Sequence, residues 1–354
     1  MRDRVKALQA SFRSELDGYI ITDLINMLYL TDFLGAATMF VPNEGESTLY
    51  IHDVNFEAGL VEAKNCRVKL AKRGENLIKN VSEQIMSQKL SKLGFDKMNV
   101  QTYEKFRKYL KNTRLEAKSE YIWKLRRVKD EDELKKIRKA GELTVEGMRT
   151  AFEAIKKGLK EYEVAAEIEY AMRTCGSYGV AFDTIVASGP RSAYPHGGCG
   201  ERKLRIGDLV VVDFGAIYKN YRADMTRTFV VGKATTKQRK YHAVVALAQE
   251  KAFQKIQDGV KATEPDMAAR ETISREGYEK YFVHGLGHGI GLETHEQPTL
   301  NPTSKDILEA GNVVTDEPGI YIVGFGGFRI EDTILVKKDI GERLTSGLHV
   351  LEAS

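Results

Sequence analysis

Three of the chain's seven histidines lie within the thirteen residues 284–296, HGLGHGIGLETHE. His284 and His288 are four residues apart, the spacing of two metal ligands on one face of a helix. Glycine, a poor helix former, occupies every second position from 285 to 291, so an extended segment is the better prediction. In such a segment glycine lets another backbone or a ligand come close. The segment also lacks the glutamate that directly follows the first histidine in helical zinc-protease motifs.

Four acidic residues stand at the borders of apolar, strand-like runs. Asp213 ends LVVVD, Asp224 precedes MTRTFVV, Glu317 lies in VVTDEPGIYI and Glu331 in FRIEDTILV. Two hairpins are predicted, one turning near residues 218–221, which lets both aspartates face one side, and one turning at GFGG between the glutamates. Strands rich in valine and isoleucine are buried, and a buried carboxylate without a partner is very costly. Something cationic must therefore neutralise these four groups.

Two sources of positive charge are compatible with this pattern. Arg222, Arg227 or Arg329 could form ion pairs with individual carboxylates, which is the ordinary outcome for any single acid. For four acids together with a glycine-framed histidine, a pair of divalent metal ions is the simpler account. Oxygen ligands with one imidazole suit Mn, Co, Fe or Zn at a two-metal centre.

The composition of the chain excludes several classes of protein. Its 354 residues, 42% hydrophobic and 29% charged, are ordinary for a soluble globular protein with room for two domains. A net charge of +4 without a concentrated basic stripe argues against nucleic-acid binding. The start of the chain has no secretory signal, and polar residues interrupt its most apolar stretch, 18–41, so we expect no membrane span. The three cysteines form no CxxC pair, which favours reduced thiols in a cytoplasmic protein.

The chain divides into two regions with different patterns of elements. In the first region we predict three strands and two helices, over residues 18–22, 38–42, 48–52, 72–92 and 102–112. A domain boundary is expected near residue 125, where a charged stretch begins. Asp130 is predicted to cap a helix over about 131–157, and a second helix is predicted over about 161–175. Beyond these helices the pattern is mainly that of β-strands.

The order of these motifs resembles that of a known group of metallopeptidases. DFG followed after eight residues by Asp, then HGxGHGxGLxxHExP, EPGIYI and RIED, is similar to methionine aminopeptidase, aminopeptidase P and prolidase. The resemblance implies an α+β fold, with a pita-bread metallopeptidase catalytic domain over residues 126–354. Residues 1–125, which contain DGYIITDLINMLYLTDF, resemble the α/β amino-terminal domain of the creatinase, prolidase and aminopeptidase P branch.

The resemblance implies a role for each of the acids and histidines. The five metal ligands of the family map onto Asp213, Asp224, His288, Glu317 and Glu331. His196 and His295 match catalytic histidines that contact the substrate, and Glu317 is also the implied general base. His284 matches a further histidine near the substrate, for which a purely structural role stays open. Arg329 is a candidate substrate contact.

The activity implied by the resemblance is hydrolysis of the bond between an amino-terminal residue and a following proline, as in Xaa-Pro aminopeptidase or Xaa-Pro dipeptidase (prolidase). The implied cofactors are two divalent ions, with Mn or Co favoured and Zn or Fe open. The implied partner is a small peptide with proline at its second position, and a homodimer is expected. The alternatives are a creatinase-type hydrolase of non-peptide amides or amidines and a non-catalytic binding module on the same fold.

Two residues depart from the pattern of the family. Asp316 stands beside Glu317, where many relatives have an apolar residue, and the alternation of strand side chains predicts that it points away from the metals. Thr299 stands where similar prolidases often carry an arginine that can hold the carboxylate of a dipeptide. Its single neutral hydroxyl favours longer peptides as substrates, unless Arg329 serves as that clamp.

Overall fold

The computed structural model of the chain describes residues 3–72 and 74–353. The chain separates into two compact units, Met1–Arg126 and Arg127–Ser354. Residues 1 and 2 of the expected first domain, and Arg73 of the helix expected at 72–92, lie outside the described residues.

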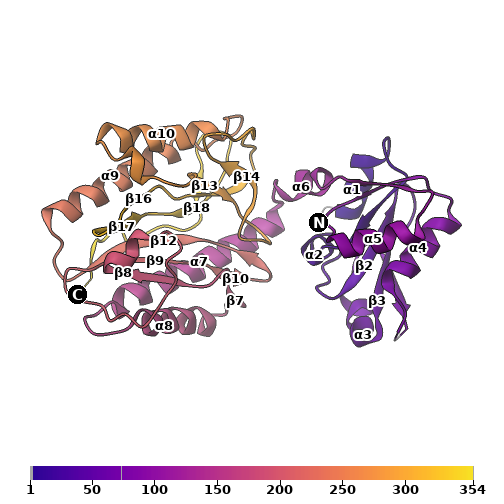
Figure 1. The fold of residues 1–354 in the computed structure, drawn as a ribbon, viewed down its shortest axis with the longest axis horizontal. Helices are drawn as coiled ribbons and strands as arrows, with labels where there is room; N and C mark the ends of the chain where they lie inside the picture. Colours follow the sequence, from indigo (N-terminus) through magenta and orange to yellow (C-terminus); the bar gives the residue numbers. More distant parts are fainter. Residues whose placement is uncertain (1–2, 73, 354) are drawn as a thin grey trace. The chain divides into compact units, whose positions relative to one another are not determined.

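The first unit is built on a six-stranded sheet with the strand order β4-β3-β2-β1-β5-β6 (Figure 1). The pairs β1–β2 and β2–β3 are antiparallel, and the remaining three pairs are parallel. The strands are β1 (Gly18–Ile21), β2 (Ala37–Pro42), β3 (Thr48–His52), β4 (Arg67–Ala71), β5 (Lys92–Phe95) and β6 (Arg114–Ala117). The helices are α1 (Arg4–Phe12), α2 (Leu24–Thr31), α3 (Asp53–Glu62), α4 (Leu77–Ser87), α5 (Val100–Tyr109) and α6 (Glu120–Arg126).

The helix expected at 72–92 is correct in its centre and wrong at its ends. α4 begins after Asn76, whose side chain accepts a hydrogen bond from the Ile78 amide and caps the helix. The last expected residue, Lys92, instead begins β5, a short buried strand that pairs in parallel with β1. Four residues are too few for periodicity to distinguish a strand from a continuing helix, so pairing with a distant strand decides the structure here.

The second unit places its strands between two layers of helices, with α7 and α8 on one side and α9 and α10 on the other (Figure 1). The helices are α7 (Glu131–Ala154), α8 (Glu161–Thr174), α9 (Thr236–Phe253) and α10 (Thr263–Arg275). One sheet has the order β20-β12-β9-β8 and another the order β14-β13-β15-β18-β19, with smaller sheets β11-β10-β7 and β16-β17. This arrangement confirms the expected α+β class.

The strands of the second unit are short, and most are antiparallel. In chain order they are β7 (Gly179–Val180), β8 (Ile185–Ser188), β9 (Leu209–Phe214), β10 (Ala216–Tyr218), β11 (Tyr221–Arg222), β12 (Met225–Val231), β13 (Gly287–Gly289), β14 (Glu296–Leu300), β15 (Val313–Asp316), β16 (Gly319–Ile322), β17 (Gly326–Arg329), β18 (Asp332–Leu335), β19 (Glu342–Arg343) and β20 (Glu352–Ala353). Two 3-10 turns, η1 (Gly189–Ala193) and η2 (Glu279–Tyr281), interrupt the connections.

Both predicted hairpins are present. Lys219 and Asn220, with φ of 46° and 71°, make the turn between β10 and β11, and β9 pairs with β12 on the outer side of that turn. In the second hairpin β16 pairs with β17, and the turn lies between Ile322 and Gly326. Each hairpin therefore brings its two acidic residues to neighbouring strand ends.

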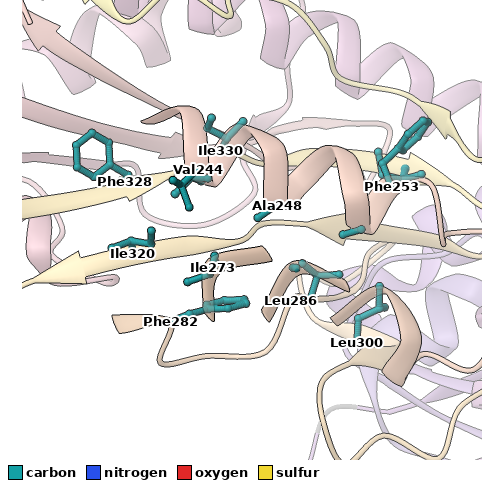
Figure 2. Close-up of a cluster of buried hydrophobic side chains, with 14 of the residues drawn as sticks. Val244, Ala248, Phe253, Ile273, Phe282, Leu286, Leu300, Ile320, Phe328 and Ile330 are labelled. Carbon is teal, nitrogen blue, oxygen red and sulfur yellow. The ribbon is translucent and has the colours of Figure 1, made fainter. Parts of the chain in front are cut away.

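Hydrophobic cores lie under both helix layers of the second unit. Figure 2 shows the core beneath α9 and α10, where Val244, Ala248 and Ile273 pack with Ile320 and Phe328 of the β16–β17 hairpin. A second core joins α7 and α8 to strands β8, β9 and β12. The four acids thus stand at the ends of strands whose other side chains are buried in these two cores. No helix within the described residues is long and apolar enough to cross a membrane.

The start of α7 confirms the predicted cap. The Asp130 side chain accepts hydrogen bonds from the amides of Asp132 and Glu133, and the Glu133 side chain accepts one from the Asp130 amide, which completes a capping box. α7 ends at Ala154 and α8 at Thr174, so the expected helices were three residues and one residue too long.

We predict that Asp130→Ala lowers the free energy of unfolding of the second unit by about 1 kcal/mol, because two amides at the first turn of α7 lose their acceptor. Urea denaturation of the full chain, followed by circular dichroism, measures this change. Asp132→Ala, on the same turn, removes an acid without removing the cap and serves as the control. An equal loss in both variants would contradict the assignment.

Candidate metal centre

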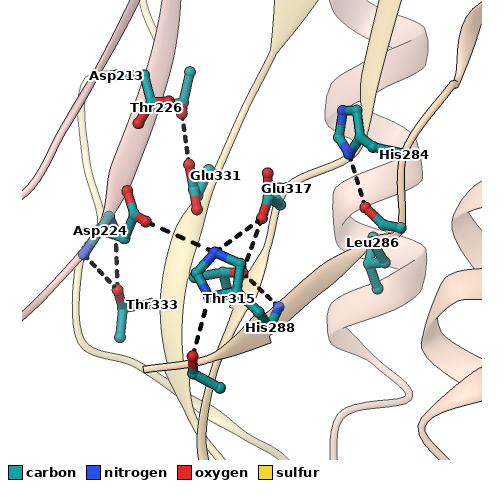
Figure 3. A network of polar contacts seen from close by, with 12 residues as sticks. Asp213, Asp224, Thr226, His284, Leu286, His288, Thr315, Glu317, Glu331 and Thr333 are labelled. Carbon is teal, nitrogen blue, oxygen red and sulfur yellow. Dashed lines mark hydrogen bonds and ion pairs between the residues drawn. The ribbon is translucent and has the colours of Figure 1, made fainter. Parts of the chain in front are cut away.

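The five residues expected to bind metal come from strand ends of the two larger sheets. Figure 3 shows the carboxylates of Asp224, Glu317 and Glu331 gathered near the His288 ring. Glu331 is joined to the other sheet by an isolated bridge to Thr226, and Thr226 lies opposite Asp213 in the β9–β12 pair. The five residues are brought together by elements between residues 209 and 335.

The distances within this group are short. His288 Nε2 lies 3.4 Å from Glu317 Oε1 and 3.9 Å from Asp224 Oδ2. Asp224, His288 and Glu331 each offer one ligand atom, and these three atoms all lie within 4.8 Å of one another. Groups at such separations can share one ion.

The charge of this group is poorly balanced by the protein itself. Asp224 is 4% exposed and Glu331 2% exposed. Among the described residues, no lysine or arginine lies within ion-pair distance of Asp224, Glu317 or Glu331. In the same part of the chain, Asp213 Oδ1 and Asp224 Oδ1 are buried without a hydrogen-bond partner. Buried carboxylate oxygens without donors, beside one imidazole, are the ligand set that divalent cations of the Mn, Co or Zn type accept, so the residues fit such ions.

The arginines account for only part of the negative charge. Arg329 pairs with Asp213, its Nη2 lying 2.5 Å from Oδ2. Arg227 instead pairs with Asp332 at 2.9 Å and donates to the backbone carbonyl of Glu331 at 2.7 Å. The ion-pair alternative therefore explains Asp213 and leaves Asp224, Glu317 and Glu331 without an arginine partner among the described residues.

The pKa values of the acids also indicate that their negative charge is only partly compensated by the protein. Burial raises the pKa of Asp224 and of Glu331 well above their ordinary values, and the neighbouring carboxylates add to the effect. Burial also raises the pKa of Glu317 to about 7. A divalent cation among these groups would reverse the shifts by favouring the ionised forms.

His288 is prepared to bind a cation through one ring nitrogen. Burial, and then the nearby His295, lower its pKa to about 4, so the ring is neutral near pH 7. Its Nδ1 lies 3.0 Å from the Gly289 carbonyl, which only an N–H can satisfy as donor. The lone pair is therefore on Nε2, the nitrogen that faces Asp224 and Glu317.

The glycines of the histidine segment serve close backbone approach, as the sequence indicated. A Cβ added at Gly287 would overlap the Thr315 carbonyl, and one added at Gly289 would overlap the Gln297 carbonyl. β13, which contains His288, therefore lies between β14 and β15 at a distance that a larger side chain would prevent. The segment is extended, and the helical alternative for His284 and His288 is excluded.

Hydroxyl groups that sequence reasoning missed hold the acids in place. Thr226 donates to Glu331 Oε2 at 2.5 Å, and Thr315 donates to Glu317 Oε1 at 3.1 Å. Both threonines stand two residues from an expected ligand, Thr226 after Asp224 and Thr315 before Glu317, and so share its strand face. This two-residue spacing along a strand is the feature of the sequence that could have identified the two threonines.

A cavity of about 850 Å³ opens above the acids. It is lined by Asp213, Asp224, His288, Glu317, Glu331, His196, His284, His295, Thr299 and Arg329, together with apolar residues that include Phe182 and Ile185. The His295 ring lies 4.2 Å from the His288 ring, measured between centroids. All the expected site residues thus border one space.

His284 and Arg329 are linked through a tyrosine hydroxyl. His284 Nε2 lies 2.9 Å from Tyr321 Oη, and Arg329 Nη1 donates to the same oxygen at 2.6 Å. Arg329 also donates from Nε to Thr226 and, as above, from Nη2 to Asp213. Its guanidinium is therefore held by protein acceptors, and its expected contact with substrate stays a prediction.

Asp316 lies outside the cavity lining. It stands opposite Asp332 in the β15–β18 pair and is fully buried. Burial, and then the nearby Asp332, raise its pKa well above the ordinary value, and neither carboxyl oxygen has a hydrogen-bond partner among the described residues. A protonated, neutral Asp316 is the form compatible with this burial.

Models of two protein families match the chain. The model of metallopeptidase family M24 matches residues 135–338, and that of the creatinase/prolidase N-terminal domain matches residues 4–128. The chain is 38% identical, over 355 residues, to the Xaa-Pro dipeptidase of Pyrococcus furiosus, with 98% of each chain covered. These matches confirm the resemblance that the motifs indicated.

Solved structures match the fold over almost the whole chain. The Xaa-Pro dipeptidase from Bacillus anthracis superposes with a TM-score of 0.94 at 33% identity, covering 99% of this chain and 98% of that one. The X-Pro aminopeptidase from Thermotoga maritima gives a TM-score of 0.89 at 32% identity, with 99% of each chain covered. The expected pita-bread domain with its creatinase-like amino-terminal domain is thereby confirmed.

We predict that Glu331→Gln and Asp224→Asn each reduce the amount of divalent metal bound per chain, because each removes a buried negative ligand. The variants should stay folded, since a neutral amide is less costly to bury than an unpaired carboxylate. Elemental analysis after dialysis against Mn²⁺ measures the bound metal, and circular dichroism measures the fold. Glu250→Gln, on the outer face of α9, is the matched control. Full metal content in either site variant would refute the ligand assignment.

Proposed function

The chain belongs to metallopeptidase family M24, and we propose that it is a dinuclear-metal peptidase that cleaves the bond between an amino-terminal residue and a following proline. The observation that carries this proposal is the set of buried, uncompensated acids around a neutral His288, at the floor of a cavity whose wall holds three further histidines. The similarity to proteins named Xaa-Pro dipeptidase and X-Pro aminopeptidase supports the choice of substrate.

We assign the metal ligands as Asp213, Asp224, His288, Glu317 and Glu331. Divalent ions held there would supply Lewis acidity, which lowers the pKa of water and polarises a carbonyl group. Glu317 is the proposed general base and later acid, because its carboxylate borders the cavity beside the other proposed ligands. It would take a proton from water and return it to the proline nitrogen that leaves.

His196 and His295 are the proposed partners of the substrate carbonyl. Both are exposed side chains on the wall of the cavity, whereas His288 is largely buried. Burial, and then His196, lower the pKa of His295, so its ring is neutral and can donate one hydrogen bond to a developing oxyanion. The acids on the floor would attract the free amino group of the peptide, which limits cleavage to the bond after the first residue.

A dedicated site for proline is physically reasonable. Proline has a fixed φ and no N–H, so a protease that binds an extended backbone through its amides binds it poorly. Here the apolar side chains of Phe182 and Ile185 line the cavity beside the histidines, and they offer contact area without needing an amide donor. The cavity volume of about 850 Å³ admits a short peptide.

The residues around Thr299 favour peptides longer than two residues. A dipeptide places a carboxylate just beyond its proline, and burying that charge requires a cationic partner. Thr299 is neutral, and its amide donates to the Asp306 carboxylate at 3.0 Å. Arg329, the sole arginine among the described lining residues, is held by Asp213, Tyr321 and Thr226. We therefore propose Xaa-Pro-Yaa peptides as the better substrates.

Three finer properties belong to the same proposal. Mn or Co is the proposed native metal, since carboxylates with one imidazole suit these ions, and Zn or Fe would also fit. A homodimer is proposed from the family resemblance. A reducing compartment such as the cytoplasm is proposed because Cys66, Cys175 and Cys199 are free thiols.

Chelation separates this function from the two alternatives. The purified chain is analysed for bound metal and assayed on Ala-Pro-Ala before and after dialysis against a chelator, with Mn²⁺ then added back. Loss and recovery of hydrolysis is the expected result. Metal-independent turnover of creatine would instead favour a creatinase-type enzyme, and absence of both hydrolysis and metal would favour a binding module.

We predict that His295→Ala keeps its metal but loses about 100- to 1,000-fold in kcat, the usual effect of removing one oxyanion donor. His288→Ala should instead lower the metal content, because it removes a ligand. Elemental analysis and initial rates on Ala-Pro-Ala measure the two effects. Metal lost at position 295 and kept at 288 would show that the two roles are reversed.

We predict that the wild type cleaves Ala-Pro-Ala with a higher kcat/KM than Ala-Pro, and that Thr299→Arg shifts the preference toward Ala-Pro. The introduced guanidinium would bind the dipeptide carboxylate. Thr299→Gln, similar in length but neutral, is the matched control and should not shift it. A clear preference of the wild type for Ala-Pro would overturn this part of the proposal.

A further inference from the structure

His196 stands on a loop whose first part, at Ser192 and Ala193, is buried against β17, whereas the part around the histidine is largely exposed. The loop leaves β8 at Ser188, passes through η1 and returns at Gly200. Tyr194, His196 and Cys199 on it are exposed, and Gly198 has a φ of +61°. A loop with such exposed residues and glycines samples many conformations unless its ends are held.

A single buried carboxylate holds both ends of this loop. Glu161, the first residue of α8, is fully buried. Its Oε1 accepts hydrogen bonds from the amide of Ser188 at 2.8 Å and from the hydroxyl of Ser188 at 2.7 Å. Its Oε2 accepts from the amide of Gly200 at 2.9 Å. The start and the end of the loop are thus tied to the same side chain.

Arg191 extends this contact to the residue next to His196. Its Nε donates to Glu161 Oε2 at 3.2 Å, and its Nη2 donates to the carbonyl of Gly197 at 2.5 Å. On the other side of His196, the carbonyl of Pro195 lies 3.4 Å from both terminal nitrogens of Arg329. The backbone on each side of His196 is therefore held by a guanidinium group.

We propose that Glu161 and Arg191 are positioning residues that hold His196 over the cavity. The inference rests on the proposed function, because it assigns a purpose to the placement of His196. Four hydrogen bonds converge on the buried carboxylate of Glu161, one of them from a guanidinium group, and together they restrict the loop to one geometry. Neither residue lines the cavity, so any effect on catalysis must pass through the loop that carries His196, and the double-mutant cycle below tests whether His196 itself is the residue affected.

The test is a double-mutant cycle between Glu161 and His196. Glu161→Gln keeps the size of the side chain but replaces one acceptor oxygen with a donor nitrogen. A misplacement of about 1 Å in a positioned group can cost about 100-fold in rate. We expect Glu161→Gln to lower kcat on Ala-Pro-Ala by about 10- to 100-fold with a smaller change in KM. In the His196→Ala background the same substitution should change kcat less than about twofold, because the group it positions is absent.

A second variant and a control address folding. Arg191→Met removes the guanidinium group that joins Glu161 to Gly197. Because this side chain is partly exposed, the substitution should destabilise the fold less than Glu161→Gln does. Its effect on kcat should likewise be lost in the His196→Ala background. Asp96→Asn, a buried carboxylate of the first unit that accepts from Thr22, Asp23 and Asn26, is the matched control. It should lower stability without lowering kcat. Equal losses of kcat from Glu161→Gln and Arg191→Met with and without His196 would overturn the proposal.

Hydrogen–deuterium exchange of the metal-free protein gives a readout that does not depend on activity. The amides of Ser188 and Gly200 and the loop between them should exchange faster in Glu161→Gln and Arg191→Met than in the wild type and in Asp96→Asn. Unchanged exchange would overturn the proposal even if the kinetics agreed.

If the metal-loaded wild type cleaves no Xaa-Pro peptide, the proposed function fails, and the inference that depends on it fails with it. If the enzyme is active and His196→Ala retains full kcat, only the role of His196, and with it this inference, is wrong.

Discussion

The burial of four carboxylates around one imidazole is the constraint on which the second unit depends. Like charges a few ångströms apart in a poorly solvated site repel strongly, and each also loses its hydration. The protein offsets only part of this cost. Arg329 compensates Asp213, hydroxyls of Thr226 and Thr315 each donate to one glutamate, and the pKa values of Asp224, Glu317 and Glu331 stay raised. The packing of the surrounding strands has to hold these groups together, and bound divalent cations would reduce their mutual repulsion.

The scaffold meets this constraint by holding each acid at the end of a strand anchored in a core. Val210 and Val212 beside Asp213 pack under α7 and α8, while Ile320 and Phe328 of the β16–β17 hairpin pack under α9. Carboxylates that repel one another cannot spread apart, because moving one would require the strands behind it to leave two well-packed layers. The same packing fixes the positions of the four acids relative to one another.

Local pattern in the sequence was enough to predict the acids, the hairpins and the α7 cap. The four acids, Asp213, Asp224, Glu317 and Glu331, stand beside apolar runs. Such runs predict strands even when the strands that they pair with are not known. The contacts between distant segments could not be predicted in this way. Nothing in the run around Glu161 indicates that it meets Ser188 and Gly200, 27 and 39 residues further on, since a glutamate at the start of a helix is expected there for the helix dipole alone. The ends of α4 and the short β5 were missed for a related reason, because a four-residue strand is defined by its pairing with β1 and β6 rather than by its own pattern.

Burial separates the histidines of the site by chemical role more clearly than spacing does. His288 and His284 both have pKa values lowered to about 4, chiefly by burial, but their Nε2 atoms face different groups. The Nε2 atom of His288 faces carboxylates, which is compatible with its proposed role as a metal ligand, whereas that of His284 meets the Tyr321 hydroxyl, which Arg329 also binds. His196 and His295 are exposed residues that line the cavity, which is compatible with their proposed contact with the substrate. A site that must hold ions permanently and peptides briefly needs both kinds of imidazole. Residues 284–296 contain both kinds, because this one glycine-rich segment runs from the more buried His288 to the exposed His295.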